Sequence, residues 1–283
     1  MAGNLIKNRI FIVGCPRSGT TLLQGLLNAH EGITSFTESH FFDFGIKQPK
    51  GGSFYYVNKN NKELVLSFLS ENNINRSLQK AILEHLPPFS AFPGKYVNEW
   101  SKFFIYLLDT ITIERGKDIW LEKTPDHLNR VEIIGRRIPD AVFLHIIRDG
   151  RDVVASLYRA SKIWKKNYSI QQCIDYWNSA INKTKKLLEK PNHHLIVYEQ
   201  LVSDYDKIVN SLFEMIRLKK MNNLQKVYNA SVKQIIGHKE SWKENNFLRI
   251  KIRSTFSDTF DKDEQTFIES ALNLDIYEEL KQV

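Results

Sequence analysis

The stretch that decides the fold is Ile10-Phe-Ile-Val-Gly-Cys-Pro-Arg-Ser-Gly-Thr-Thr-Leu-Leu23. An apolar run typical of a buried strand leads into a tight turn that contains Gly14, Pro16 and Gly19, and an apolar helical pattern follows. A loop of this kind directs successive backbone N–H groups, and the positive end of a helix, at one point. The stretch therefore predicts a phosphate-binding loop between a strand and a helix.

The loop departs from the nucleotide P-loop at one position. Gly14, four further residues and Gly19 reproduce the P-loop spacing, but Thr20 stands where the lysine would be. Arg17, inside the loop, is the cation that replaces this lysine. We therefore expect an anionic ligand that is held differently from ATP.

Composition narrows the class of protein. The 283 residues are 42% hydrophobic, and 40 basic against 32 acidic side chains give a net charge of +8, which favours anionic partners. The chain has no basic tail or repeated Lys/Arg stripe, so nucleic acid is not the predicted partner. Its first residues lack the apolar segment typical of a signal peptide, and no apolar run is long enough for a membrane span, so we expect neither feature. Its two cysteines predict a reducing, cytoplasmic compartment, with Cys15 as a buried thiol.

The order of apolar segments predicts an α/β fold. Strand-like runs at 10–13, 119–121, 141–147 and 195–198 are separated by helical patterns, which favours a mostly parallel central sheet flanked by helices. We expect residues 1–283 to form a single domain with an insertion at about 31–118. Between Phe36 and Tyr106 lie 15 of the 33 aromatic residues. Most of these should form a core, and a minority could line an acceptor cleft.

Polar side chains follow the predicted strands at the point where each strand ends. These segments are the loop after Val13, then Glu122-Lys123, then Arg148-Asp149, and finally Tyr198-Glu199. Ligands of open parallel sheets bind outside the carboxyl ends of the strands. The sequence therefore predicts one crevice that is lined by N–H groups, a lysine, arginines and a tyrosine.

The segment after the longest apolar strand has two interpretations. As a Walker-B strand, it would use Asp149 to bind magnesium. Alternatively, Asp149 caps the next helix, and Arg148 binds an anion together with Ser156, eight residues further on. The second interpretation predicts a second phosphate site beside the loop, and the missing P-loop lysine favours it.

Together these segments resemble the PAPS-dependent sulfotransferases (PAPS is 3′-phosphoadenosine 5′-phosphosulfate). Residues 15–23 resemble the loop that holds the 5′-phosphosulfate, and residues 148–156 resemble the 3′-phosphate motif. Leu121-Glu-Lys-Thr-Pro125 looks like the lysine segment of many bacterial, carbohydrate and tyrosylprotein sulfotransferases. Residues 197–202 are similar to the later strand whose tyrosine lies near the nucleotide. The resemblance spans residues 10 to about 202.

The resemblance implies a P-loop NTPase-like sulfotransferase fold and transfer of a sulfuryl group from PAPS to an acceptor hydroxyl or amine. PAPS is the cosubstrate, and no metal is required. Lys123 would neutralise charge at the sulfuryl group. The implied nucleotide-binding residues are Arg17, Ser18, Gly19, Thr20, Thr21, Arg148, Ser156 and Tyr198.

The general base and the C-terminal nucleotide contacts are less closely defined. Glu38 lies 21 residues after Arg17, where tyrosylprotein-type relatives place a catalytic glutamate, while cytosolic relatives use a histidine, for which His40 is the candidate. The Arg-Lys-Gly segment of cytosolic members is missing. Trp242 or Lys243 could take its place, although a helix surface is an equal expectation for both.

Two other functions compete with sulfuryl transfer. A kinase-like phosphotransferase would need ATP and magnesium, and a basic nucleic-acid-binding module would show steep salt dependence. The sequence leaves the acceptor open: a carbohydrate, a phenol or another hydroxyl compound would fit equally well. His193 and His194 read as a loop that precedes a strand.

Overall fold

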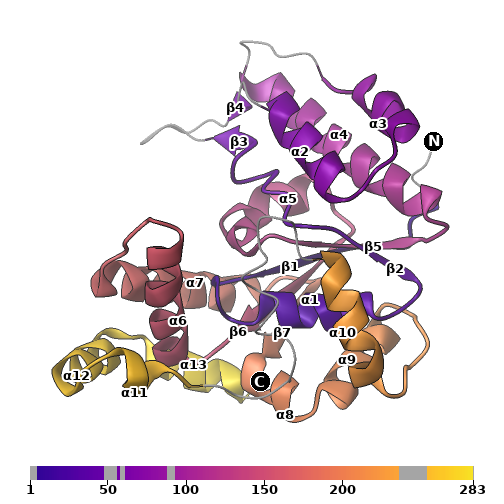
Figure 1. Ribbon diagram of the computed structural model, residues 1–283. Helices are drawn as coiled ribbons and strands as arrows, with labels where there is room; N and C mark the ends of the chain where they lie inside the picture. The colour runs from indigo at the N-terminus through magenta and orange to yellow at the C-terminus, as the bar shows by residue number, and fades with distance from the viewer. Residues whose placement is uncertain (1–4, 48–55, 58–60, 88–92, 236–253, 283) are drawn as a thin grey trace.

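A computed structural model describes residues 5–47, 56–57, 61–87, 93–235 and 254–282 (Figure 1). Its main sheet has five strands, in the order β2-β5-β1-β6-β7, and every neighbouring pair is parallel. A separate pair, β3 and β4, is antiparallel. The strands are β1 (Asn8–Gly14), β2 (Ile33–Ser35), β3 (Ile46–Lys47), β4 (Tyr56–Val57), β5 (Ile119–Lys123), β6 (Ala141–Ile147) and β7 (His193–Val197).

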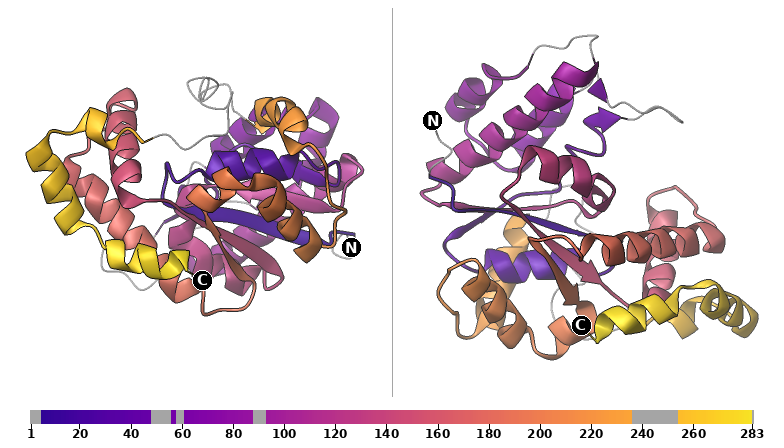
Figure 2. Two further views of the ribbon diagram at one scale, coloured as in Figure 1. Left: turned by 90° about the horizontal axis from the view of Figure 1, so that it is seen from below. Right: turned by 180° about the vertical axis from the view of Figure 1, so that it is seen from behind.

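Helices cover both faces of this sheet (Figures 1 and 2). On one face α1 packs against β1, and α9 and α10 pack against α1. The helices α2, α3 and α4 lie beyond the opposite face. Of the C-terminal helices, α11 packs on α6, whereas α12 and α13 pack on α7. The helices are α1 (Thr20–Asn28), α2 (Asn61–Glu71), α3 (Arg76–Leu83), α4 (Pro93–Glu114), the 3₁₀ helix η1 (Pro125–Arg130), α5 (Val131–Arg137), α6 (Gly150–Ile163), α7 (Ile170–Leu187), α8 (Tyr198–Ser203), α9 (Tyr205–Met215), α10 (Leu224–Ile235), α11 (Phe256–Thr259), α12 (Lys262–Ala271) and α13 (Leu274–Lys281).

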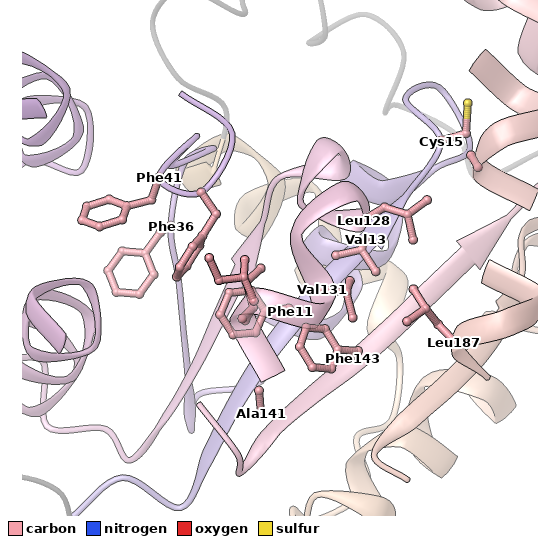
Figure 3. Close-up of a cluster of buried hydrophobic side chains, with 14 of the residues drawn as sticks. Phe11, Val13, Cys15, Phe36, Phe41, Leu128, Val131, Ala141, Phe143 and Leu187 are labelled. Carbon is pink, nitrogen blue, oxygen red and sulfur yellow. The ribbon is translucent and has the colours of Figure 1, made fainter. Parts of the chain in front are cut away.

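The central strand shows why its sequence is apolar without alternation. Ile10 and Ile12 lie in the core under α1, whereas Phe11 and Val13 lie in the core on the other face. Phe11 packs near Phe143 of β6 in the cluster that Figure 3 shows. A parallel strand buried on both faces needs apolar residues at every position, so the run at 10–13 is explained.

The connections place β1 at a switch in strand order. The chain passes from β1 to β2 and β5 on one side, then crosses to β6 and β7 on the other. In open parallel sheets the crevice at such a switch point holds the ligand. The predicted mostly parallel α/β sheet with helices on both faces is confirmed, and the loop after β1 lies at this switch point.

Several aromatic residues of the expected insertion lie in the core. Among the described ones, a buried set packs on the same sheet face as Phe11, which confirms the expected core role for that set: Phe36, Phe41, Phe42, Phe68, Trp100, Phe103 and Phe104. Phe44 is different, with half of its surface exposed. Within the described ranges, no helix is long and apolar enough to cross a membrane.

The interpretation of His193 and His194 as a loop is wrong, because both residues belong to β7. His193 Nδ1 lies 2.8 Å from His145 Nε2 of the neighbouring strand, and this cross-strand contact pairs two polar rings inside the sheet. The strand also ends at Val197, so that Tyr198 begins α8 and is not the last residue of the strand.

Candidate functional site

The carboxyl ends of four parallel strands meet at one edge of the sheet. Lys123 at the end of β5 is in register with Ile12 of β1, and Gly14 is in register with Ile146 of β6. Ile147 in turn pairs with Val197 of β7. The loops that follow these strands therefore begin side by side, which confirms the predicted convergence of the polar segments.

The loop after β1 has a backbone that requires glycine at position 19. Gly19 has a φ of +96°, and a Cβ atom there would lie 2.4 Å from Cδ2 of Tyr198. Arg17 also adopts a positive φ, of 75°. Ser18 is buried, and its Oγ has no hydrogen-bond partner among the described residues. A buried hydroxyl without a protein partner in a phosphate-type loop is suited to a ligand oxygen.

Helix α1 begins directly after this loop. Thr20 is its first residue, and Thr21 follows in the first turn. The cap residue Gly19 has no side chain that could accept a hydrogen bond, so no capping side chain occupies the first-turn N–H groups. The positive end of α1 and the N–H groups of the loop thus favour an anion at this point.

Arg148 and Ser156 lie next to this loop and are connected to it. Arg17 Nε donates to Ser156 Oγ over 3.0 Å, which joins the loop to helix α6. The Arg148 guanidinium stacks on the ring of Tyr198, 4.4 Å from its centroid, and Arg148 Nη2 donates to Asp152 Oδ2 over 3.2 Å. Two cationic positions therefore border one strand edge, as expected for two phosphate groups.

Tyr198 contacts both of these positions. Its ring packs so closely against Gly19 that a Cβ atom there would clash with it, and the Arg148 guanidinium stacks on the same ring. The residue is only 9% exposed. The structure therefore places Tyr198 as a spacer between the loop and Arg148.

Asp149 is a helix cap. Its Oδ1 accepts from the N–H of Arg151 over 2.9 Å, and its side chain also pairs with the Arg151 guanidinium. Burial would raise the pKa of Asp149, but the hydrogen bonds from Arg151 outweigh it and hold the pKa below the usual value. This arrangement agrees with the capping interpretation rather than with the Walker-B one.

The end of β5 brings a lysine and a glutamate together. Lys123, with 2% of its side chain exposed, pairs through Nζ with Glu38 Oε1, 85 residues away in the sequence. Glu38 Oε2 lies 3.6 Å from His40 Nε2, and His40 Nδ1 lies 3.0 Å from Asp43 Oδ2. Both candidate bases are thus beside the candidate lysine, on the loop that follows β2.

Sequence reasoning missed a buried carboxylate behind this pair. Glu122 is fully buried and accepts from Ser39 Oγ over 2.8 Å, from Thr124 Oγ1 over 2.6 Å and from His127 Nδ1 over 3.0 Å. Burial would raise the pKa of Glu122, but His127 and the hydroxyls lower it. One signal in the sequence points to it: a glutamate inside an apolar strand is rarely buried without partners.

The remaining predicted positions divide into two groups. Cys15 is buried, and burial raises the pKa of its thiol well above the usual value, as expected for a structural rather than a reactive cysteine. Trp242 and Lys243 lie outside the described residues. Among the residues that are described, no group of three or more His, Cys, Asp or Glu side chains could hold a metal ion.

Comparison with known proteins identifies the family. Residues 9–222 match the model described as "Sulfotransferase family", and the chain therefore belongs to the sulfotransferase family. It is 26% identical over 199 residues to a protein-tyrosine sulfotransferase of Drosophila melanogaster, covering 68% of this chain and 34% of that protein. It is 22% identical over 250 residues to omega-hydroxy-beta-dihydromenaquinone-9 sulfotransferase Stf3 of Mycobacterium tuberculosis, with coverages of 74% and 62%. The chain thus spans less than two thirds of these relatives.

Solved structures confirm the fold. The sulfotransferase domain from the curacin biosynthetic pathway superimposes with a TM-score of 0.61 at 18% identity, covering 93% of this chain and 96% of that domain. Mouse sulfotransferase SULT7A1 complexed with PAP gives a TM-score of 0.56 at 12% identity, with coverages of 99% and 92%. The predicted P-loop-like sulfotransferase fold is confirmed by these similarities.

Proposed function

We propose that this protein transfers the sulfuryl group of PAPS to a hydroxyl, or an amine, of an acceptor molecule. Family membership supports the reaction class. The observation that carries the proposal is the link between two anion sites, made by the hydrogen bond from Arg17 Nε to Ser156 Oγ. PAPS carries phosphate at both its 3′ and 5′ positions, and adjacent cationic sites suit such a molecule.

The proposed roles follow from position. The loop residues Arg17, Ser18, Gly19, Thr20 and Thr21 would bind the 5′-phosphosulfate, because they combine a cation, a buried hydroxyl and the start of α1. Arg148 and Ser156 would bind the 3′-phosphate. In-line transfer needs little more than alignment and stabilisation of charge, and a fixed cation at the end of β5 supplies the second of these.

Lys123 and Glu38 form the proposed reaction centre. Their ion pair would open when the anionic donor binds, because the sulfuryl and phosphate oxygens compete for Lys123 Nζ. Glu38 would then be available as general base for the acceptor hydroxyl, with His40 beside it as the second candidate.

The acceptor and its surroundings are also part of the proposal. Relatives act on protein tyrosine and on a hydroxylated menaquinone, by their names, and both are hydroxyl compounds. We propose that residues 1–283 work as one sulfotransferase unit, in which the insertion at about 31–118 covers the acceptor side. The half-exposed Phe44, close to His40, is the residue of that insertion best placed for this role. The free cysteines favour a reducing compartment such as the cytoplasm.

A kinase-like phosphotransferase that uses ATP and magnesium is less well supported. Thr20 replaces the P-loop lysine, and Asp149 is engaged by the N–H and guanidinium of Arg151. A carboxylate held in this way caps its own helix and is poorly placed to coordinate magnesium.

Calorimetric titration tests the proposal without knowledge of the acceptor. We would titrate the protein with PAP, the 3′,5′-bisphosphate product, in EDTA, and compare ADP under the same conditions and ATP with magnesium. We expect micromolar or tighter binding of PAP without metal and much weaker binding of ADP. A preference for ATP with magnesium would refute the sulfotransferase proposal. A screen of acceptors with labelled PAPS would follow.

A further inference from the structure

The loop after β2 places three titratable side chains in a row that leads away from Lys123. Glu38 comes first, His40 lies 3.6 Å from it, and Asp43 lies 3.0 Å from the far side of the His40 ring. His40 holds a φ of 50°, a conformation that an L-residue adopts only at some cost. Its backbone is fixed there by a hydrogen bond from its N–H to Thr124 Oγ1 over 3.3 Å and by Phe44 N–H, which donates to its carbonyl over 2.9 Å.

Asp43 determines which nitrogen of His40 carries the proton. Burial would raise the pKa of Asp43, but the neighbouring His127 and His40 rings outweigh burial and hold the pKa well below the usual value. Asp43 therefore stays ionised and accepts a hydrogen bond from Nδ1–H of His40. In the neutral ring this leaves a lone pair on Nε2, which faces Glu38 Oε2.

A second histidine supports this arrangement from behind. His127 Nε2 lies 3.6 Å from Asp43 Oδ1 and 3.1 Å from the backbone N of Phe42, while its Nδ1 donates to the buried Glu122. Burial would lower the pKa of His127, but the Glu122 and Asp43 carboxylates outweigh burial and raise this pKa to about 10. His127 therefore helps to keep both carboxylates ionised.

The charged surroundings of His40 come from three segments, which are its own loop, β5 and η1. Glu38 and Asp43 face it from its own loop, and Glu38 is itself paired with Lys123 of β5. His127 and Asp126 of η1 complete the set of charges that act on this region. Phe44 lies parallel to the imidazole with ring centroids 4.5 Å apart, and about a third of the His40 side chain reaches solvent.

We propose that His40 receives from Glu38 the proton that the acceptor hydroxyl loses, and that Asp43 is a positioning residue that holds the imidazole for this transfer. The inference rests on the proposed sulfotransferase function. After it takes the acceptor proton, Glu38 is a neutral carboxylic acid and can no longer form its ion pair with Lys123. The proton must therefore leave Glu38 before the next turnover. His40 provides the route by which this proton reaches solvent.

Atoms and electrons balance in this step. The acceptor oxygen forms a bond to sulfur while the bond from sulfur to the 5′-phosphate oxygen breaks, and that electron pair stays on PAP. The acceptor proton passes to Glu38 and then to Nε2 of His40, which becomes an imidazolium paired with Asp43. Loss of this proton to water restores the resting state. The gap of 3.6 Å must shorten by roughly half an ångström for direct transfer, and such contacts are often long before substrate binds.

The first test measures the tautomer of His40 by nitrogen NMR of the full chain with isotope-labelled histidine. Above the pKa of His40, we expect the proton on Nδ1 and a lone pair on Nε2. In Asp43→Asn the spectrum should shift toward a mixture or the opposite tautomer. A wild-type His40 with its proton on Nε2 would overturn the proposal, whatever the activity.

The second test measures the pH dependence of sulfuryl transfer from PAPS, with 4-nitrophenol as the acceptor probe and water as the alternative acceptor. Burial lowers the pKa of His40, but Asp43 and Glu38 outweigh burial and raise it above the usual value. The rate should therefore fall as acid converts His40 to the imidazolium. Asp43→Asn should move this acid limb to lower pH, and His40→Gln should remove it with a loss of about 10- to 100-fold. A rate that rises as His40 becomes protonated would refute the relay.

Chemical rescue separates a proton-transfer role from a structural one. Added imidazole should restore part of the rate of His40→Ala, because removal of the imidazole leaves space beside Glu38 and a third of the replaced side chain is exposed. His85→Ala is the matched control, since His85 is an exposed histidine at the end of α3. PAP affinity should be unchanged in all of these variants. Failure of PAP binding in the wild type would instead refute the proposed function itself.

Discussion

Replacing Gly19 by alanine should weaken nucleotide binding through the ring of Tyr198. The new Cβ would lie 2.4 Å from Cδ2 and 2.8 Å from Cε2 of that ring, and the backbone φ of +96° disfavours any side chain. A left-handed conformation costs about 1–2 kcal/mol for an L-residue. Overpacking adds about 1–3 kcal/mol. We therefore expect the free energy of unfolding to fall by about 2–5 kcal/mol.

Gly116→Ala provides a matched control for the backbone cost. Gly116 also has a positive φ, of 69°, but no atom lies within 4 Å of the position that its Cβ would take. The difference between the two variants, measured by urea unfolding, isolates the contact with Tyr198. PAP affinity, measured by calorimetry, should fall about 10- to 100-fold in Gly19→Ala and stay near the wild-type value in Gly116→Ala.

The ring itself can be tested by combination. The double variant Gly19→Ala with Tyr198→Ala no longer has the clash. Its loss of unfolding free energy should therefore be smaller than the sum of the losses in the two single variants. Strict additivity, or wild-type PAP affinity in Gly19→Ala, would refute the assignment of Tyr198 as a spacer between the loop and Arg148.

Three further predictions concern other parts of the molecule. Lys123→Ala should lower turnover by about 10²–10³-fold with a smaller effect on PAP affinity, because the cation acts on charge that develops during transfer. Arg148→Lys should weaken PAP binding about tenfold without changing ADP binding, since lysine cannot keep both the stack on the ring and a forked contact with phosphate. Burial lowers the pKa of His145 to about 3 and that of His193 to about 4, so the unfolded chain binds more protons below pH ~6.5 and stability should fall with acid, by up to about 1.4 kcal/mol per pH unit from His145.

Controls make these three predictions decisive. Equal and modest losses of turnover and PAP affinity in Lys123→Ala would contradict its role at the sulfuryl group, with the exposed Lys102→Ala as the reference. Equal weakening of PAP and ADP by Arg148→Lys would place the arginine outside the 3′-phosphate site. Urea unfolding between about pH 5 and pH 7 checks the histidine pair, and an unfolding free energy that rises with acid would contradict the stated sign.

The parts of the site that follow a strand could be predicted from the sequence. A buried parallel strand is a continuous apolar run, so its end is visible, and the polar residues after it must lie at the same sheet edge. This pattern of apolar runs with polar ends places three parts of the site, which are Lys123, Arg148 and the loop that contains Arg17. Asp149 as a helix cap follows from the same placement.

What could not be predicted depends on contacts between distant segments. Glu122 is stabilised by Ser39, 83 residues away, and by His127 on the following 3₁₀ helix. The hydrophobic periodicity of a strand does not show which distant residues will contact it. A buried glutamate therefore conflicts with the strand prediction until its hydrogen-bond partners are known. The adjacent polar residues His193 and His194 suggest a loop in the sequence. The partner of His193 is His145 on another strand, and the sequence around His193 does not show this contact.

The ion pair between Lys123 and Glu38 has a kinetic consequence. While the donor is absent, Lys123 and Glu38 are paired with each other. The Glu38 carboxylate is then not available to take the proton of an acceptor that arrives first. An arriving donor withdraws the lysine and uncovers the carboxylate. We therefore expect compulsory-order kinetics in which the nucleotide enters first, so that acceptor analogues should inhibit uncompetitively with respect to PAPS.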